Sequence, residues 1–99
     1  MEEFIYYNNL FDIYEALLTE KERVTFRDYY HEDLSLSEIA SEKNVSRSAV
    51  YKTLKNVIDK LNYYEDNLHI YKKKTALIEI VNLEDLALLK NKLKEILDM

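Results

Sequence analysis

The chain has no glycine, no proline and no cysteine among its 99 residues. Glycine-rich loops that hold dinucleotides or nucleoside triphosphates cannot be built without glycine, and neither can the usual calcium-binding loop. The lack of cysteine excludes disulfide bonds and thiolate metal sites and is typical of a reducing compartment, so we expect a cytoplasmic protein. No stretch approaches the roughly 18 consecutive apolar residues of a membrane span, and no membrane insertion is expected.

What the chain does contain is enough apolar sequence for one core. Hydrophobic residues make up 47% of it, and charged residues are interspersed rather than clustered. The net charge of −5 is uneven, because residues 1–45 sum to −7, residues 46–74 to +4 and residues 75–99 to −2. A protein that coats nucleic acid generally is therefore not expected, but one basic segment is present.

The first two helices are predicted from apolar spacing and one capping pattern. Apolar residues recur every three or four positions over residues 3–18, which predicts a helix with one buried face. Thr19 and Glu22 then have the spacing of a capping box, so a second helix is expected to begin near Glu20 and to end around residues 31–33.

The next two helices are marked by their ends. Ser35 and Glu38 form another capping box, which starts a short third helix. Asn44 is the expected left-handed residue that ends it, because asparagine best replaces glycine there. Ser46 is expected to cap a fourth helix.

The fourth helix is predicted to be long. Its apolar positions alternate in steps of four and three, as in a coiled coil: Val50, Leu54, Val57, Leu61, Tyr64, Leu68 and Tyr71. The pattern continues weakly to Ile78, so one helix reaching about residue 80 is predicted, followed by a last helix capped by Asn82 and packed antiparallel to it. The competing interpretation is a winged helix-turn-helix with strands on either side of residues 72–74.

The segment between Leu36 and Lys55 has the form of a helix-turn-helix. Ala40 is a small residue where two helices would cross closely. Ile39, Val45 and Val50 are predicted to fill the space between the helices. This pattern predicts DNA-binding ancestry for the unit.

If Val50 faces inward, six residues at the start of the fourth helix form the candidate nucleic-acid-binding surface. They are Ser46, Arg47, Ser48, Tyr51, Lys52 and Lys55. Arg47 is suited to guanine or phosphate, the two lysines to phosphate, and Ser48 and Tyr51 to a base edge or to stacking. Ser35 and Ser37 are a second candidate for phosphate contact, at the start of the third helix. For Ser46 and Ser35 the alternative is a simple helix cap.

Two positions depart from a strong DNA-binding pattern. Lys43 stands where an apolar residue usually packs, and Thr53 replaces a buried aliphatic residue. The first three helices also carry many carboxylates, which would weaken attraction to phosphate and make it sensitive to salt. A retained fold with a changed partner is therefore an open alternative.

Across residues 9–71 the chain resembles the YlxM family, small helix-turn-helix proteins associated with the signal recognition particle and related in fold to region four of sigma factors. The matching segments are Asn9–Asp12, Tyr14, Leu17–Thr19, Tyr29–Tyr30, Asp33–Ala40, Val45–Arg47, Ala49–Tyr51, Tyr64–Glu65, Leu68 and Tyr71. The resemblance implies an all-helical protein with a long fourth helix and a role in the signal recognition particle pathway. Ser48 and Lys52 stand where it implies glutamine and an acidic residue, so this surface is more basic.

Together these patterns predict an all-α helix-turn-helix bundle with a long fourth helix and a C-terminal helix. Residues 1–70 are expected to form the helix-turn-helix domain, with a recognition helix beginning at residue 47, and residues 71–99 a helical extension that packs on the long helix or on a second subunit. The long apolar stripe of the fourth helix predicts a homodimer, because one further helix would not cover it.

The function expected from sequence is regulation through DNA binding. The alternatives are RNA binding, with Tyr51 and Tyr63 stacking on bases, and a protein-interaction module acting on the signal recognition particle or its receptor. An enzyme is not expected, because His31 and His69 stand alone in different helices and the neighbouring carboxylates fit solvated helix faces. No cofactor is expected.

Overall fold

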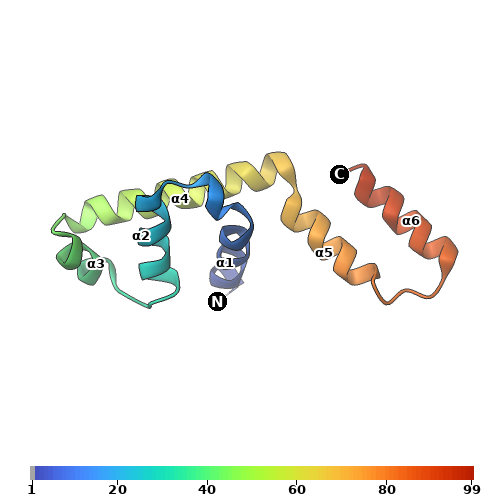
Figure 1. Ribbon diagram of the computed structural model, residues 1–99, viewed down its shortest axis with the longest axis horizontal. Helices are drawn as coiled ribbons and strands as arrows, with labels where there is room; N and C mark the ends of the chain where they lie inside the picture. The colour runs from blue at the N-terminus through green and yellow to red at the C-terminus, as the bar shows by residue number, and fades with distance from the viewer. Residues whose placement is uncertain (1) are drawn as a thin grey trace.

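The computed structural model describes residues 2–99, which form helices joined by short connections (Figure 1). The elements are α1 (Glu2–Tyr14), the 3-10 turn η1 (Glu15–Leu17), α2 (Glu20–Tyr30), α3 (Leu36–Lys43), α4 (Arg47–Leu68), α5 (Ile70–Ile80) and α6 (Leu86–Leu97). No strand occurs in residues 2–99, so the all-α prediction is confirmed and the winged alternative is wrong. No helix in this range is both long enough and apolar enough to cross a membrane.

The predicted helix ends are confirmed where they depend on local sequence. Both capping boxes form, with Thr19 accepting from the backbone of Glu22 and Ser35 accepting from that of Glu38. Asn44 ends α3 in the left-handed conformation, with φ of 54°. The capping residue therefore fixes each of these boundaries.

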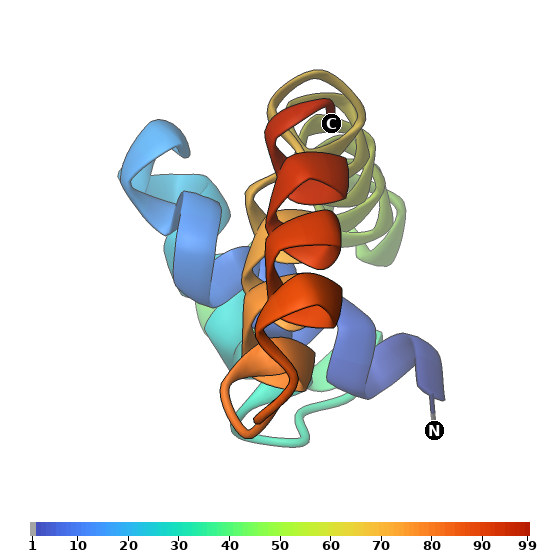
Figure 2. The ribbon, with the colours of Figure 1, turned by 90° about the vertical axis from the view of Figure 1, so that its right-hand side faces the viewer.

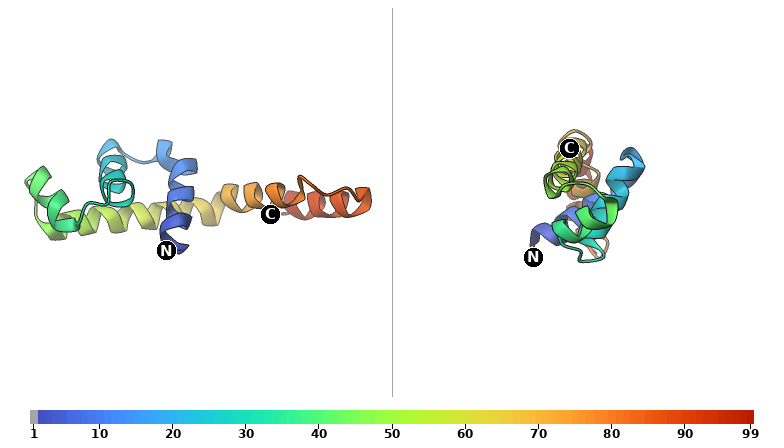
Figure 3. Two further views of the ribbon diagram at one scale, coloured as in Figure 1. Left: turned by 90° about the horizontal axis from the view of Figure 1, so that it is seen from below. Right: turned by 90° about the vertical axis from the view of Figure 1, so that its left-hand side faces the viewer.

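Helix α4 is the central helix of the fold, and α1 and α2 lie across it (Figure 3). Its inward side chains belong to two buried clusters, one shared with α1 and α2 and the other with α3. Val57 and Leu61 are completely buried within the chain. The apolar stripe of α4 is thus largely buried within the chain itself. The argument that a second subunit must cover this stripe therefore no longer holds.

The prediction of one helix from residue 47 to about residue 80 is wrong, because the chain breaks at His69. His69 has a left-handed backbone with φ of 54°, and a new helix begins at Ile70. The buried carboxylate of Glu65 accepts from the backbone N–H groups of Tyr71 and Lys72, both at 3.0 Å. These bonds satisfy donors at the start of α5, in the way that a capping side chain does.

Two other boundaries also differ from prediction. Helix α1 ends at Tyr14, not near residue 18, and the guanidinium of Arg23 donates to the carbonyl of Leu18 at 2.6 Å, beyond the 3-10 turn. The last helix begins at Leu86 rather than after Asn82, because Asp85 is the residue that caps it, accepting from the N–H of Leu88 at 2.9 Å.

Helices α5 and α6 form an antiparallel pair at the far end of the molecule from α3 (Figures 1 and 2). The partner of α6 is thus α5, not the long helix. We call residues 2–68 the body and residues 70–99 the C-terminal hairpin. Within the hairpin only Ile80 and Ile96 are buried, and the molecule measures 58 × 22 × 18 Å. The fold is elongated, with a well-packed body and a thinly packed hairpin.

Candidate nucleic-acid interface

The helix-turn-helix is held by a small apolar cluster between α3 and α4. Ile39 and Ala40 pack against Val50 and Leu54. The prediction that Val45 fills this space is wrong, since Val45 is 47% exposed. Its N–H donates to the carbonyl of Ala40 at 3.0 Å, so the turn uses the backbone of Val45 while Leu54 supplies the buried side chain.

All six predicted contact residues are exposed, and they lie on the first part of α4. Ser46 caps the helix, its Oγ accepting from the N–H of Ala49 at 3.0 Å. Arg47, Ser48, Tyr51, Lys52 and Lys55 follow in the first turns of the helix and are exposed, whereas Val50 and Leu54 among them are buried. We call the exposed side chains of these six residues the α4 surface.

Carboxylates neutralise some basic groups of the unit but not all. Lys55 pairs with Asp59 at 3.6 Å, and Lys43 pairs with Asp28 of α2 at 3.5 Å. Within residues 2–99, neither Arg47 nor Lys52 takes part in an ion pair. These two cations are thus available to an anionic ligand without the loss of an existing contact.

The structure also explains the two departures noted in the sequence. Lys43 does not enter the core; it is exposed and bridges α3 to α2 through Asp28. The half-buried Thr53 returns its hydroxyl to the carbonyl of Ala49 at 3.1 Å, which satisfies its polar group within α4. Neither residue disrupts the helix-turn-helix.

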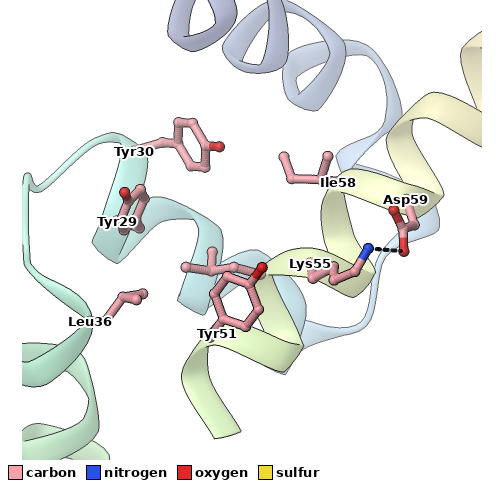
Figure 4. A pocket seen from close by; sticks show the side chains of 8 residues that line it. Tyr29, Tyr30, Leu36, Tyr51, Lys55, Ile58 and Asp59 are labelled. Atoms are coloured by element: carbon pink, nitrogen blue, oxygen red, sulfur yellow. Dashed lines mark ion pairs between the residues drawn. The ribbon is translucent and has the colours of Figure 1, made fainter. Parts of the chain in front are cut away.

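Beside the α4 surface lies an open hollow of about 320 Å³ (Figure 4). Aromatic and aliphatic side chains from α2, α3 and α4 line it together with one ion pair: Tyr29, Tyr30, Leu36, Tyr51, Leu54, Ile58 and the Lys55–Asp59 pair. Tyr51 and Lys55 belong to both the hollow and the α4 surface. A planar or apolar group of a ligand could therefore bind next to the basic side chains.

Sequence reasoning missed this hollow because Tyr29 and Tyr30 fit the buried face of α2. Both are only half-buried, and Phe4 lies over them with ring centroids 6.1 and 4.6 Å away. The useful signal was the residue type, because a tyrosine is less often fully buried than an aliphatic residue or phenylalanine. Tyr63, the other candidate for stacking, is exposed on α4 outside the hollow.

Two buried polar contacts lie away from the α4 surface. The hydroxyl of Tyr14 donates to Glu65 at 2.6 Å, and burial together with this bond raises the pKa of Tyr14 to about 12. Burial also acts to raise the pKa of Glu22, but hydrogen bonds from Lys60, at 2.9 Å, and from Thr19 outweigh it, so that pKa is lowered. Both contacts join helices of the body and are structural.

The described residues offer no evident metal centre. His31 lies edge-on to the rings of Phe11 and Phe26. His69 is at the α4–α5 break. No group of three or more histidine or acidic side chains in residues 2–99 is arranged to hold a metal ion.

Comparison with known proteins gives a family match over the whole chain. Residues 1–99 match the UPF0122 family model, described as "Putative helix-turn-helix protein, YlxM / p13 like". A UPF0122 protein of Fusobacterium nucleatum is 43% identical over 86 residues, covering 86% of this chain and 84% of the relative. Another from Desulforamulus reducens is 44% identical over 89 residues, covering 86% and 76%. One from Bacillus cereus is 50% identical over 66 residues, covering 67% and 60%.

Proposed function

Because the chain belongs to the UPF0122 family of YlxM/p13-like helix-turn-helix proteins, we propose that it is a cytoplasmic regulatory protein that binds double-stranded DNA through the α4 surface. The observation that carries this proposal is that Arg47 and Lys52 are both exposed in the first turns of α4 and stand without carboxylate partners in the described chain. The proposed role is binding without catalysis.

Each side chain of the α4 surface has a role in this proposal. Arg47 stands at the N-terminal turn of α4, where recognition helices meet base edges, and its guanidinium suits guanine or a phosphate. Lys52 supplies phosphate contact, and Lys55 does so after exchanging Asp59 for a phosphate oxygen. Ser48 and Tyr51 lie between them and would contact a base edge or the backbone.

The test compares a triple variant, Arg47→Ala/Lys52→Ala/Lys55→Ala, with the parent protein. Binding to a pool of random-sequence DNA duplexes is measured by fluorescence anisotropy at several salt concentrations. Each lost phosphate contact lowers the slope of log K against log salt by about 0.9, so we expect the slope to fall by about 2 to 3 and affinity to fall at least about tenfold.

The matched control is Lys72→Ala/Lys92→Ala/Lys94→Ala, which removes the same charge from exposed positions of α5 and α6. This control should keep most of the parent's affinity. If both variants lose affinity equally, binding reflects net charge alone and the α4 surface is not the site. Unchanged binding by the first variant would also refute the proposal.

A second candidate function is a protein-interaction module that modulates the signal recognition particle or its receptor, as the YlxM resemblance implies. The ion pairs of Lys43 and Lys55 and the aromatic hollow beside Tyr51 favour it, because they suit a protein side chain better than a phosphate backbone. Under this function Tyr51→Ala removes co-purification with a targeting GTPase, while the triple variant retains it. If the protein instead binds RNA, it should bind a pool of single-stranded RNA through stacking of Tyr51 and Tyr63 on bases.

The proposal includes a homodimer. Helix-turn-helix proteins commonly bind as two-fold dimers, which place two recognition helices on one duplex. Since the α4 stripe is covered within the chain, the dimer contact must use another surface.

A further inference from the structure

The C-terminal hairpin has two matching apolar stripes that nothing in the chain covers. Both stripes follow the same spacing of four, three and four residues, with a lysine in the second place. The first stripe is Ile70, Lys74 and Leu77 on α5 with Val81 directly after it, and the second, on α6, is Leu86, Lys90, Leu93 and Leu97. All eight residues are exposed, Val81 to 76% and Leu97 to 82%.

The two stripes lie on the same side of the hairpin. Ile80 and Ile96 are the buried residues that mark where α5 and α6 face each other. The residues of each stripe stand 10, 6 and 3 positions before and 1 position after the buried isoleucine of their helix. When two helices are antiparallel, residues at equal distances in sequence from the contact point toward the same side of the pair. Topology also places Ile70 at the same end as Leu97, and Val81 at the same end as Leu86. We call this combined surface the hairpin face.

The chain exposes more surface than a compact monomer of its size, and a second subunit that covers part of this surface would account for the excess. The chain exposes 7106 Å², whereas a compact monomer of 11.9 kDa exposes about 5,900 Å². Its radius of gyration is 17.5 Å, against about 12.6 Å for a compact chain of this length. The excess of about 1,200 Å² exceeds the roughly 800 Å² that each partner buries in a standard stable interface.

We propose that a second copy of this chain covers the hairpin face, so that two hairpins form a four-helix bundle across a two-fold axis. A copy of the same chain supplies stripes of the same spacing, which is the requirement of a self-complementary interface. Lys74 and Lys90 lie at the edge of the face, where their stems cover apolar surface while their ammonium groups stay in water. This interface rests on the homodimer included in the proposed function and locates it.

Sedimentation equilibrium of the full chain tests the interface. The parent protein should be dimeric at about 100 µM, and Leu77→Glu/Leu93→Glu should weaken association at least about 100-fold, because four carboxylates would be buried per dimer. The control Ile5→Glu/Leu17→Glu adds the same charge at two exposed apolar positions of the body and should remain dimeric. A monomeric parent protein, or a double variant that associates as the parent does, overturns the proposal.

A second measurement does not depend on how the charged variant folds. Because the chain has no cysteine, Leu93→Cys introduces a single thiol into the middle of the hairpin face. A short bis-maleimide should join two copies of this variant, whereas Ile5→Cys should stay uncrosslinked. Equal crosslinking of both variants would contradict the proposed interface.

The two proposals fail separately. The Arg47→Ala/Lys52→Ala/Lys55→Ala variant should remain dimeric, so loss of DNA binding with an intact dimer concerns the α4 surface alone. A parent protein that binds DNA through the α4 surface as a monomer contradicts the homodimer and its hairpin interface, but not DNA binding by the α4 surface.

Discussion

The body and the C-terminal hairpin consist of similar amphipathic helices, yet they are packed very differently. In the body, side chains from α1, α2 and α4 form a continuous buried cluster, and α3 adds a second one. In the hairpin, each helix has leucines and isoleucines at core spacing, but only Ile80 and Ile96 are buried. The difference shows that apolar spacing predicts a helix and its apolar face. Whether that face is buried depends on whether another segment of the chain packs on it.

The two regions are joined through one buried carboxylate. Glu65 belongs to the body's long helix, accepts from Tyr14 of α1, and caps the first turn of α5. Tyr14 also accepts from the N–H of Ile70 at 3.3 Å. The start of the hairpin is therefore fixed by the body even though most of the hairpin is not.

The largest difference should appear when one core residue is truncated in each region. Leu61→Ala should lower the free energy of unfolding by about 3 to 4 kcal/mol, because it leaves a cavity at a fully buried position. Ile80→Ala should cost about 2 kcal/mol, the low end for such a truncation, because few buried residues surround it. Urea unfolding followed by circular dichroism measures both values. Equal costs would mean that the hairpin is packed as well as the body.

The junction should give an intermediate effect. Glu65→Gln removes the charge from a group that accepts from Tyr14, Tyr71 and Lys72, and should cost about 2 kcal/mol. Amide hydrogen exchange should accelerate mainly in residues 70–80 while α3 stays protected. Tyr14→Phe removes one of the same bonds, so the effects of the two substitutions should be less than additive. Acceleration spread evenly over the chain would show that the junction has no local role.

The smallest effect should come from the ion pair between α2 and α4, and it should depend on pH. The folded pKa of Glu22 is lowered from the ordinary 4.5, so this contact stabilises the protein above that pH and is lost as the pH falls through the folded pKa. Glu22→Gln keeps the capping box, since glutamine also serves at that position. It should cost about 1 kcal/mol at neutral pH, since the side chain of Lys60 is partly exposed, and progressively less as the pH falls below 4.5.

The matched control for this measurement is Glu20→Gln, an exposed carboxylate in the same turn of α2. It should leave the acid dependence of stability close to that of the parent. Identical pH profiles for Glu22→Gln and the parent protein would contradict the assignment.

The features predicted correctly are those that neighbouring residues determine. Both capping boxes and the left-handed Asn44 follow from residues close in sequence, and so does the exposure of Ser48, Lys52 and Lys55 beside the buried Val50 and Leu54. The break at His69 could not be predicted in this way, because it depends on Glu65 being buried beside Tyr14, 51 positions away in sequence. The aromatic hollow likewise requires three helices to meet, and no single segment encodes it.

The elongated shape bounds the spacing of any DNA half-sites. The α4 surface begins at one end of a molecule 58 Å long, and the hairpin forms the other end (Figure 1). Two copies paired through their hairpins would overlap by about 17 Å, the length of an 11-residue helix. Their recognition helices would then lie at most about 100 Å apart, or about three turns of B-form DNA. A dimer of this kind would suit widely separated half-sites, or two segments of a bent duplex, better than adjacent ones.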